Sequence, residues 1–359
     1  MGADFFSIDR LKVGRYDLYV DYLGYHASRL NQILVTTGKE QFVSVGLEES
    51  TLLMDEVFVL AKFDASKPLN EMVTNSVRSF SVEETSRYAA SISDPARMVQ
   101  SYAGLLWRMD GVEIPNPNHF SDLGGTGGSI SMLSASTLTN SDFYTGAFPA
   151  EFGNALSGVF DLKMRTGNNE KREHAFQIGT LGLEAASEGY FSKGSRASYL
   201  INYRYSTIYL IKDLLPSLSE KVDPFQDLSF KINLPTKKSG TFSLFGLGGL
   251  NSSYEPSPAD TSDFIFDWQL QNSQVSQSMG VMGFSHRYIF SDRWYLRTAL
   301  TSSIWHYDDE TTLLQPTSNF DPLIIDVTRF NQKETSLSVI LNYKVDAGIN
   351  FRSGFNLRQ

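Results

Sequence analysis

The stretch LLWRMDGVEIPNPNHFSDLGGTGGSISMLSASTLTNSDFYTGAFPAEFGNALSGVFDLKMRTG, residues 105–167, decides the fold. It is rich in Gly, Ser and Asn, and its apolar runs are short, as at Leu105–Trp107, Ile130–Leu133 and Val159–Met164. This pattern predicts short strands joined by tight turns, with too little apolar area to form a core alone. Downstream, longer segments alternate apolar and polar residues. We therefore expect a compact insert followed by a β-barrel wall.

Three parts of this stretch, LLWRMDGVEIPNPNHF, GGTGGSISML and SDFYTGAFPAEFGNALSGVFDLKMRTGNN, resemble the plug of TonB-dependent outer-membrane receptors of the Bacteroidetes type, in the family's order. The resemblance implies a plug seated in a large barrel in the outer membrane of a Gram-negative cell. It implies import of a scarce nutrient, whether siderophore, cobalamin, glycan or peptide. The implied partners are TonB of the inner-membrane energising complex, outer-membrane lipid, the nutrient ligand and a surface lipoprotein.

The composition limits the function. The chain has 31 Lys+Arg against 40 Asp+Glu, a net charge of −9, which argues against nucleic acid as a partner. Cysteine is absent, so there is no disulfide, thiolate metal site or cysteine nucleophile. No apolar run is long enough for a transmembrane helix, and the N-terminus MGADFFSIDR lacks the features of a signal peptide. For an exported protein, this missing signal indicates a truncated chain.

Residues 1–50 are expected to form a small antiparallel β module. Arg15–Val20 alternates as a strand does, and Asn31–Thr36 and Gln41–Leu47 follow it, separated by a turn at Thr37-Gly38-Lys39. The segment FFSIDRLKVGRYDLYVDYLGY resembles the second half of the carboxypeptidase-regulatory-like β-sandwich that precedes many such plugs. The module is therefore expected to be a partial sandwich.

Residues 51–70 are expected to link that module to the plug, residues 71–168. Five consecutive residues in this linker resemble a TonB box, the segment that the energising partner captures: Asp55, Glu56, Val57, Phe58 and Val59. An apolar run after two acids suits addition as a strand to a partner's sheet edge. The alternative is the last strand of the preceding module. The position between module and plug favours the box.

The first part of the plug is predicted to contain one helix. Ser93 or Asp94 can cap it, and Pro95 suits its first helical position. The family's plug has a further strand-and-loop segment with an Arg-Gly pattern before LLWR. This chain lacks that segment at Gly104.

Residues 169–359 show a period of two, which marks a sheet with one apolar and one polar face. Nine strands are predicted, near residues 174–180, 182–191, 197–206, 225–234, 241–251, 274–290, 293–307, 329–345 and 348–357. The fold class is therefore mainly β: a small α+β plug followed by the first part of an antiparallel transmembrane barrel. A plugged transporter barrel has ~22 strands, so the chain is expected to be a fragment.

The connections provide an independent test. Short links follow the second, fourth, sixth and eighth strands: Ser192–Arg196, Pro235–Gly240, Ser291–Asp292 and Asp346–Ala347. Long links follow the third, fifth and seventh: Ser206–Pro224, Ser252–Ser273 and Asp308–Thr328. Outer-membrane barrels alternate short periplasmic turns with long outer loops, whereas a soluble sandwich has no reason to do so.

The plug loop carries the candidate ligand contacts, which are Asn116, Asn118, His119 and Phe120. The alternative for His119 is a turn with a hydrogen-bonded imidazole. The glycine-rich run Gly124–Gly128 lacks the Gly-Lys-Ser/Thr of a phosphate-binding loop, and the five histidines are scattered. No enzyme activity, cofactor or metal site is therefore expected.

Two further groups have less specific interpretations. Asp308-Asp309-Glu310 is expected to be solvated charge at the base of a long loop. The aromatic residues Trp294, Trp305 and Tyr307 suit a girdle at the membrane boundary of a barrel. In a soluble sandwich they would serve as core packing.

A different class of function is kept as the alternative: a secreted or surface β protein that binds glycan or protein without transport. The two hypotheses differ in what surrounds residues 105–167. A receptor places them against the inner face of a barrel wall, whereas the alternative predicts two stacked sheets with this stretch outside.

Overall fold

The structure is a computed structural model, and the chain divides into two compact units, Met1–Lys67 and Pro68–Gln359. The residues that the structure describes are 6–8, 11–12, 14–20, 28–35, 77–80, 94, 104–125, 127–139, 141–146, 148–179, 182–207, 209, 223–257, 270–291, 293–315, 321–345 and 349–359.

In the first unit, β1 (Gly14–Val20) pairs antiparallel with β2 (Ser28–Val35), where two of the strands were predicted. The third predicted strand, Gln41–Leu47, lies outside the described residues. The TonB-box-like segment Asp55–Val59 also lies outside them, as does the predicted plug helix apart from Asp94.

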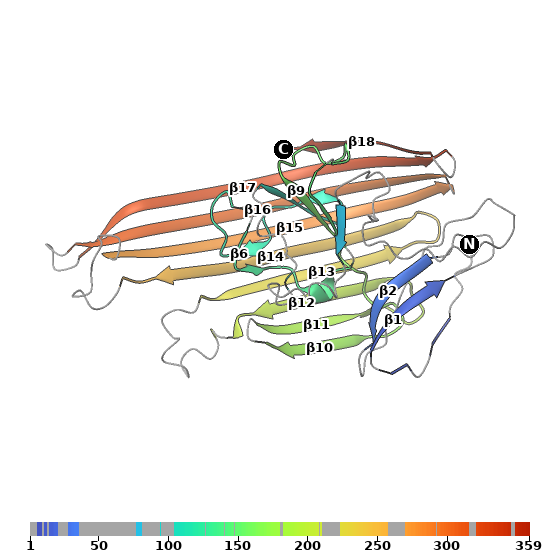
Figure 1. Cartoon of the computed structure of the whole chain (residues 1–359), viewed down its shortest axis with the longest axis horizontal. Helices are drawn as coiled ribbons and strands as arrows, with labels where there is room; N and C mark the ends of the chain where they lie inside the picture. The colour runs from blue at the N-terminus through green and yellow to red at the C-terminus, as the bar shows by residue number, and fades with distance from the viewer. Residues whose placement is uncertain are drawn as a thin grey trace. The chain divides into compact units, whose positions relative to one another are not determined.

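The second unit is built on a nine-stranded antiparallel sheet whose strands follow one another in chain order (Figure 1). These strands are β10 (Glu173–Ile178), β11 (Leu183–Tyr190), β12 (Ser198–Tyr205), β13 (Phe225–Pro235), β14 (Thr241–Glu255), β15 (Gln271–Ser291), β16 (Trp294–Gln315), β17 (Asp321–Lys344) and β18 (Asn350–Arg358). We call this sheet the wall. All nine predicted strands are confirmed, and so is the fold class of a plug followed by part of an antiparallel barrel.

The hairpin of β16 and β17 is longer than the sequence predicts. Its register continues to Gln315 opposite Asp321, through the pairs Thr312–Ile324 and Leu313–Leu323. The predicted long loop Asp308–Thr328 is therefore wrong, because favourable cross-strand pairs of apolar and β-branched residues continue beyond the acidic run. Asp308-Asp309-Glu310 lies within β16 rather than at the base of a loop.

Alternate residues of the wall face opposite sides. In β13, Asp227 and Lys231 are buried, whereas Leu228 and Leu234 are each 41% exposed. The exposed large apolar residues of the wall's outer face include Ile201, Tyr203, Leu228, Leu250, Met282, Phe284, Leu300, Ile304, Phe355 and Leu357. Soluble proteins rarely expose so extensive an apolar face, whereas the outer face of a membrane barrel is covered by lipid.

The plug contains a five-stranded sheet in the order β3-β8-β9-β4-β5. Its strands are β3 (Val77–Phe80), β4 (Leu105–Met109), β5 (Val112–Glu113), β8 (Ser141–Tyr144) and β9 (Gly158–Leu162). The β4–β5 hairpin turns through Asp110 and Gly111, whose φ angles of 49° and 81° are those of a type I′ turn. The two-residue strands β6 (Asn118–His119) and β7 (Ile130–Ser131) form a separate sheet.

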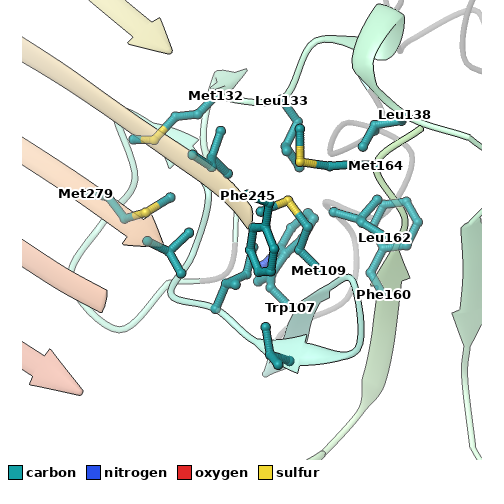
Figure 2. Packing of buried hydrophobic residues seen from close by; sticks show 14 of the residues in the cluster. Trp107, Met109, Met132, Leu133, Leu138, Phe160, Leu162, Met164, Phe245 and Met279 are labelled. Carbon is teal, nitrogen blue, oxygen red and sulfur yellow. The ribbon is translucent and has the colours of Figure 1, made fainter. Parts of the chain in front are cut away.

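Plug and wall share one apolar core (Figure 2). Phe245 of β14 is completely buried, and Trp107, Met109 and Met132 of the plug belong to the same cluster. Each such buried side chain stabilises the structure by roughly 1.5–3 kcal/mol. Because the plug packs on the inner face of a single sheet, the arrangement expected of the soluble alternative is not found in the described residues.

Two of the three candidate girdle residues face inward. Trp305 packs against the shared core, and Tyr307 is buried and donates a hydrogen bond to Asp309. The girdle interpretation is wrong for both, because the register of β16 places them on the same side as Ala299 of the core. Trp294 lies on the outer face, stacked on Tyr343 at a centroid distance of 4.0 Å.

Replacing Phe245 with Ala should destabilise the seated plug strongly, by about 3–5 kcal/mol, because it opens a cavity in the shared core. The measurement is urea unfolding of the folded protein in detergent micelles. Leu300→Ala, on the outer face and 51% exposed, is the matched control and should cost much less. Equal losses in the two variants would contradict the shared core.

Candidate functional site at the plug–wall interface

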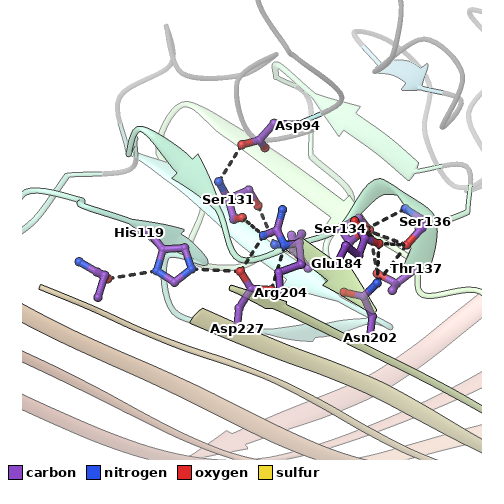
Figure 3. Close-up of polar contacts among 12 residues, drawn as sticks. Asp94, His119, Ser131, Ser134, Ser136, Thr137, Glu184, Asn202, Arg204 and Asp227 are labelled. Atoms are coloured by element: carbon purple, nitrogen blue, oxygen red, sulfur yellow. Dashed lines mark hydrogen bonds and ion pairs between the residues drawn. The ribbon is translucent and has the colours of Figure 1, made fainter. Parts of the chain in front are cut away.

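His119 lies between the plug and the wall and is completely buried. Its Nε2 is 3.2 Å from Oδ2 of Asp227 (Figure 3). Its Nδ1 is 3.1 Å from Oδ1 of Asn251. The ring of Phe225 packs against the imidazole at 5.0 Å. Gly249 makes room for it, because a Cβ at that position would lie 2.7 Å from Cε1 of His119. The imidazole therefore fits a site that two neighbouring wall strands, β13 and β14, build.

Arg204 of β12 joins the same carboxylate to the plug backbone. Its Nε and Nη2 donate to the two carboxylate oxygens of Asp227 at 3.0 and 2.8 Å, and Nη2 also donates to the carbonyl of Ser131. The N–H of Ser131 donates to Oδ2 of Asp94 at 2.7 Å (Figure 3). Asp227 thus accepts from wall and plug at once, with its side chain only 1% exposed.

Gln277 of β15 holds the plug loop at a second point. Its Oε1 accepts from the N–H of Ser121 at 3.2 Å, and its Nε2 donates to the carbonyl of the same residue. Asn251 donates to Oε1 of Gln277 at 3.3 Å. A continuous network therefore runs from Asp94 to Ser121 and passes repeatedly between plug and wall.

Two glutamates of β11 form further plug anchors. Oε1 of Glu184 accepts from the hydroxyls of Ser134 and Ser136 at 2.8 and 2.7 Å. Glu188 forms two hydrogen bonds with Arg165, at 2.5 and 2.8 Å, and accepts from the N–H of Asn168. The Glu188 contacts fix the end of the plug where the chain passes into the wall, and the Glu184 contacts hold the short turn at residues 134–136.

The β4–β5 turn is anchored to two cationic side chains of the wall. Nζ of Lys231 lies 2.8 Å from Oδ2 of Asp110, and Nη2 of Arg297 donates to the carbonyl of Gly111 at 3.0 Å. A Cβ at Gly111 would collide with the Arg297 guanidinium, so glycine is required there for contact as well as for its positive φ.

A buried ion pair also lies within the plug itself. Nε of Arg108 is 3.9 Å from Oδ1 of Asp161, and both side chains are nearly inaccessible. Burial raises the pKa of the Asp161 carboxyl, and the nearby Arg108 charge opposes this shift. Burial likewise lowers the pKa of Arg108. The pair is a charged element of the plug separate from the network at Asp227.

The four candidate ligand contacts lie on one loop but differ in exposure. Asn118 and His119 are buried, and the hydrogen bonds of His119 match the alternative interpretation of that residue. Asn116 donates to the carbonyls of Gly125 and Gly127, each at 3.1 Å. Phe120 is half-buried at a φ of 55°, and Leu123, three residues further along the chain, is 43% exposed.

The residues that the sequence did not single out are the wall partners: Arg204, Asp227, Asn251 and Gln277. The sequence does contain a pattern that could have identified them. In β13, polar residues such as Asp227 and Lys231 occupy alternate positions, on the face opposite the apolar one. Within the described residues, no group of three or more side chains suited to a metal ion is found. None of the described helices has the length and apolar character needed to cross a membrane.

Comparison with known proteins supports the fold. No protein-family model and no curated protein matches the sequence. The open form of the ferric-catecholate import receptor Fiu from E. coli K12 matches at a TM-score of 0.50 and 10% identity, over 80% of this chain and 49% of that chain. The copper transporter OprC matches at 0.46 and 9%, over 80% and 55%. BauA, the ferric preacinetobactin receptor from Acinetobacter baumannii, matches at 0.46 and 12%, over 72% and 39%.

The chain therefore spans about half the length of the solved receptors that it resembles. At this level of identity the similarity to Fiu is one of fold. It agrees with the plug and partial barrel described above.

Asp227→Ala should weaken the plug–wall contact by about 3–5 kcal/mol, because it leaves two buried basic groups without their carboxylate. Urea unfolding in detergent measures the loss. Adding Arg204→Ala should cost less than the sum of the single changes, with a coupling of roughly 1–3 kcal/mol. Asp308→Ala breaks an exposed pair with Arg329 and should cost at most ~1 kcal/mol. Strict additivity of the first two changes would contradict the shared network.

Proposed function

We propose that this chain forms the plug and the first part of the barrel of a TonB-dependent outer-membrane receptor that imports a scarce nutrient. The observation that carries the proposal is the division of the wall into two faces. Its inner face holds residues 105–167 through hydrogen bonds, ion pairs and the shared apolar core, and its outer face carries exposed apolar side chains. This division suits a plugged transport barrel in lipid.

The fold comparison supports a transport role rather than catalysis, since the matched proteins are import receptors and a transporter by name. We place the protein in the Gram-negative outer membrane. The nutrient is a siderophore, cobalamin, glycan or peptide. The soluble alternative is disfavoured because it leaves the outer face of the wall without a covering layer.

We place the ligand-facing surface on the plug loop that begins at Asn116. Ser121, in the same loop, contacts Gln277. Gln277 lies near the N-terminal end of β15, where the long link from β14 enters the strand. That end faces the outside in an outer-membrane barrel. Asn116 and Phe120 would contact the ligand, and the buried Asn118 and His119 would support the loop from the wall side.

We further propose that Asp55–Val59 is the TonB box. A short run of acids followed by β-forming residues suits pairing with the edge of a TonB sheet. The partners are then TonB, outer-membrane lipid and the nutrient, with a surface lipoprotein on the outer side. The segment 1–50 is the carboxypeptidase-regulatory-like module that precedes the linker, plug and barrel.

The complete gene product should fractionate with the outer membrane and should migrate faster on denaturing gels when unheated, because a closed barrel resists detergent at room temperature. The measurement is membrane fractionation followed by electrophoresis with and without boiling. A freely soluble protein whose mobility does not respond to heat would refute the transport proposal.

Val57→Pro should abolish capture of the full-length protein by purified TonB, because proline removes a backbone donor that strand pairing needs. A co-purification assay measures the interaction. Ala65→Pro, outside the candidate box but in the same linker, is the control and should leave capture intact. Unchanged capture of the Val57 variant would remove the box assignment.

A further inference from the structure

The plug consists of two parts that are attached to the wall differently. The five-stranded sheet ends at β9, and the chain then enters the wall directly, fixed on the way by Arg165 and Glu188. Residues 117–132, which we call the latch segment, include the separate β6–β7 sheet with only two residue pairs. This segment therefore lies outside the strand ladders of the five-stranded sheet, although several of its side chains are buried.

Side chains of the wall hold the latch segment at three points. Gln277 binds the backbone of Ser121, Asp227 and Asn251 bind the His119 ring, and Arg204 binds the carbonyl of Ser131. These three contacts are hydrogen bonds, and Met132 adds an apolar contact with the shared core. Water that enters an opening gap can replace such bonds, since each group then keeps a partner.

The network includes Asp94, which precedes the latch segment in the chain and accepts from the N–H of Ser131. Ser131 is therefore held from two sides, by Asp94 through its N–H and by Arg204 through its carbonyl. Displacement of the chain around Asp94 removes one of these restraints. A movement of the chain at Asp94 is thus transmitted through Ser131 to Asn118, its partner in the β6–β7 sheet and the residue before His119.

We propose that the latch segment is the part of the plug that separates from β12–β15 when the path through the barrel opens, while the five-stranded sheet stays seated. The network centred on Asp227 holds it closed. This assignment rests on the transport function proposed above. It names Asp94, Arg204, Asp227 and Gln277 as positioning residues for the gate.

This chain contains no cysteine, so engineered cysteines can test the gate once any cysteine elsewhere in the full-length protein has been replaced with serine. A Cβ at Gly249 would lie 2.9 Å from Cγ of Met132. In a cysteine at residue 132, the sulfur atom would take the place of this Cγ. This spacing suits a disulfide between Met132→Cys and Gly249→Cys. Gly280 and Ile304 are register partners on the outer face, so Gly280→Cys with Ile304→Cys gives a control disulfide that does not touch the plug.

The first experiment measures conductance of the full-length protein in planar lipid bilayers containing potassium chloride. Asp227→Asn should raise the frequency of openings about tenfold over the parent, as expected for loss of a charge-assisted contact. The 132–249 disulfide, added to this variant, should suppress the openings until dithiothreitol is added. The 280–304 disulfide should leave them unchanged. Openings that persist with the 132–249 disulfide closed would overturn the proposal.

A second experiment uses single, milder substitutions in cells that express the full-length protein. Met132 and Met164 are buried to 2% and 3% exposure, one in the latch segment and one after β9. Met132→Cys should react with a membrane-impermeant maleimide at least severalfold faster in energised cells than in protonophore-treated cells. Met164→Cys should stay protected in both. Equal labelling of both residues would overturn the proposal, because the whole plug would then leave the wall.

The two proposals fail in different ways. If the import function is wrong, TonB capture and heat-dependent mobility are lost, whatever the cysteine pairs show. If only the gate is wrong, the protein remains a heat-modifiable barrel that TonB captures, and the disulfide between residues 132 and 249 has no effect on its conductance.

Discussion

The carboxylate of Asp227 is the constraint on which the plug–wall contact depends. An ionised carboxylate buried to 1% exposure is very unfavourable unless basic groups and hydrogen-bond donors surround it. Arg204 supplies two of these donors from the neighbouring strand, and His119 approaches from the plug. The wall strand can therefore bury this residue only while the plug lies in one position. One side chain thus couples the register of the plug to that of the sheet.

The period of two along each wall strand makes this coupling compatible with a membrane. In β13, Asp227 faces the plug and the next residue, Leu228, faces outward. The same strand therefore serves two environments that have opposite requirements. A shift of one residue in register would place the carboxylate in lipid and the leucine in the polar network. The pattern strongly favours one pairing.

The sequence predicted the wall well because its information is local. Nine strands followed from alternation and from the short turns, and the structure confirms them. The extended β16–β17 hairpin was missed because an acidic run interrupts the apolar pattern while cross-strand partners such as Leu313 and Leu323 still pair. The inward orientation of Trp305 depends on the register of β16, which residue type alone does not reveal.

The network at the candidate site depends on tertiary structure and was not predictable in this way. His119 and Asp227 are 108 positions apart in the chain, and Ser121 and Gln277 are 156 apart. Their contact requires the docked plug, for which a single sequence offers no local signal. Sequence reasoning did single out the loop at His119 as a ligand-contact candidate, with a hydrogen-bonded turn as its alternative, because turns rich in Asn and Pro favour side chains that bind backbone groups. It could not identify the wall residues that would meet that loop.

The interface combines two kinds of contact that have different physical effects. The apolar cluster around Phe245 removes surface from water and supplies free energy without fixing direction. The polar network contributes less net stability, since buried charges lose their hydration, but its geometry admits one arrangement. Methionines from both sides, Met132 and Met279, adapt to small displacements of this core. In such a plug the apolar core closes the space between plug and wall, and the hydrogen bonds fix the orientation of the plug. Loss of the hydrogen bonds would therefore let the plug shift while the apolar contact is still made.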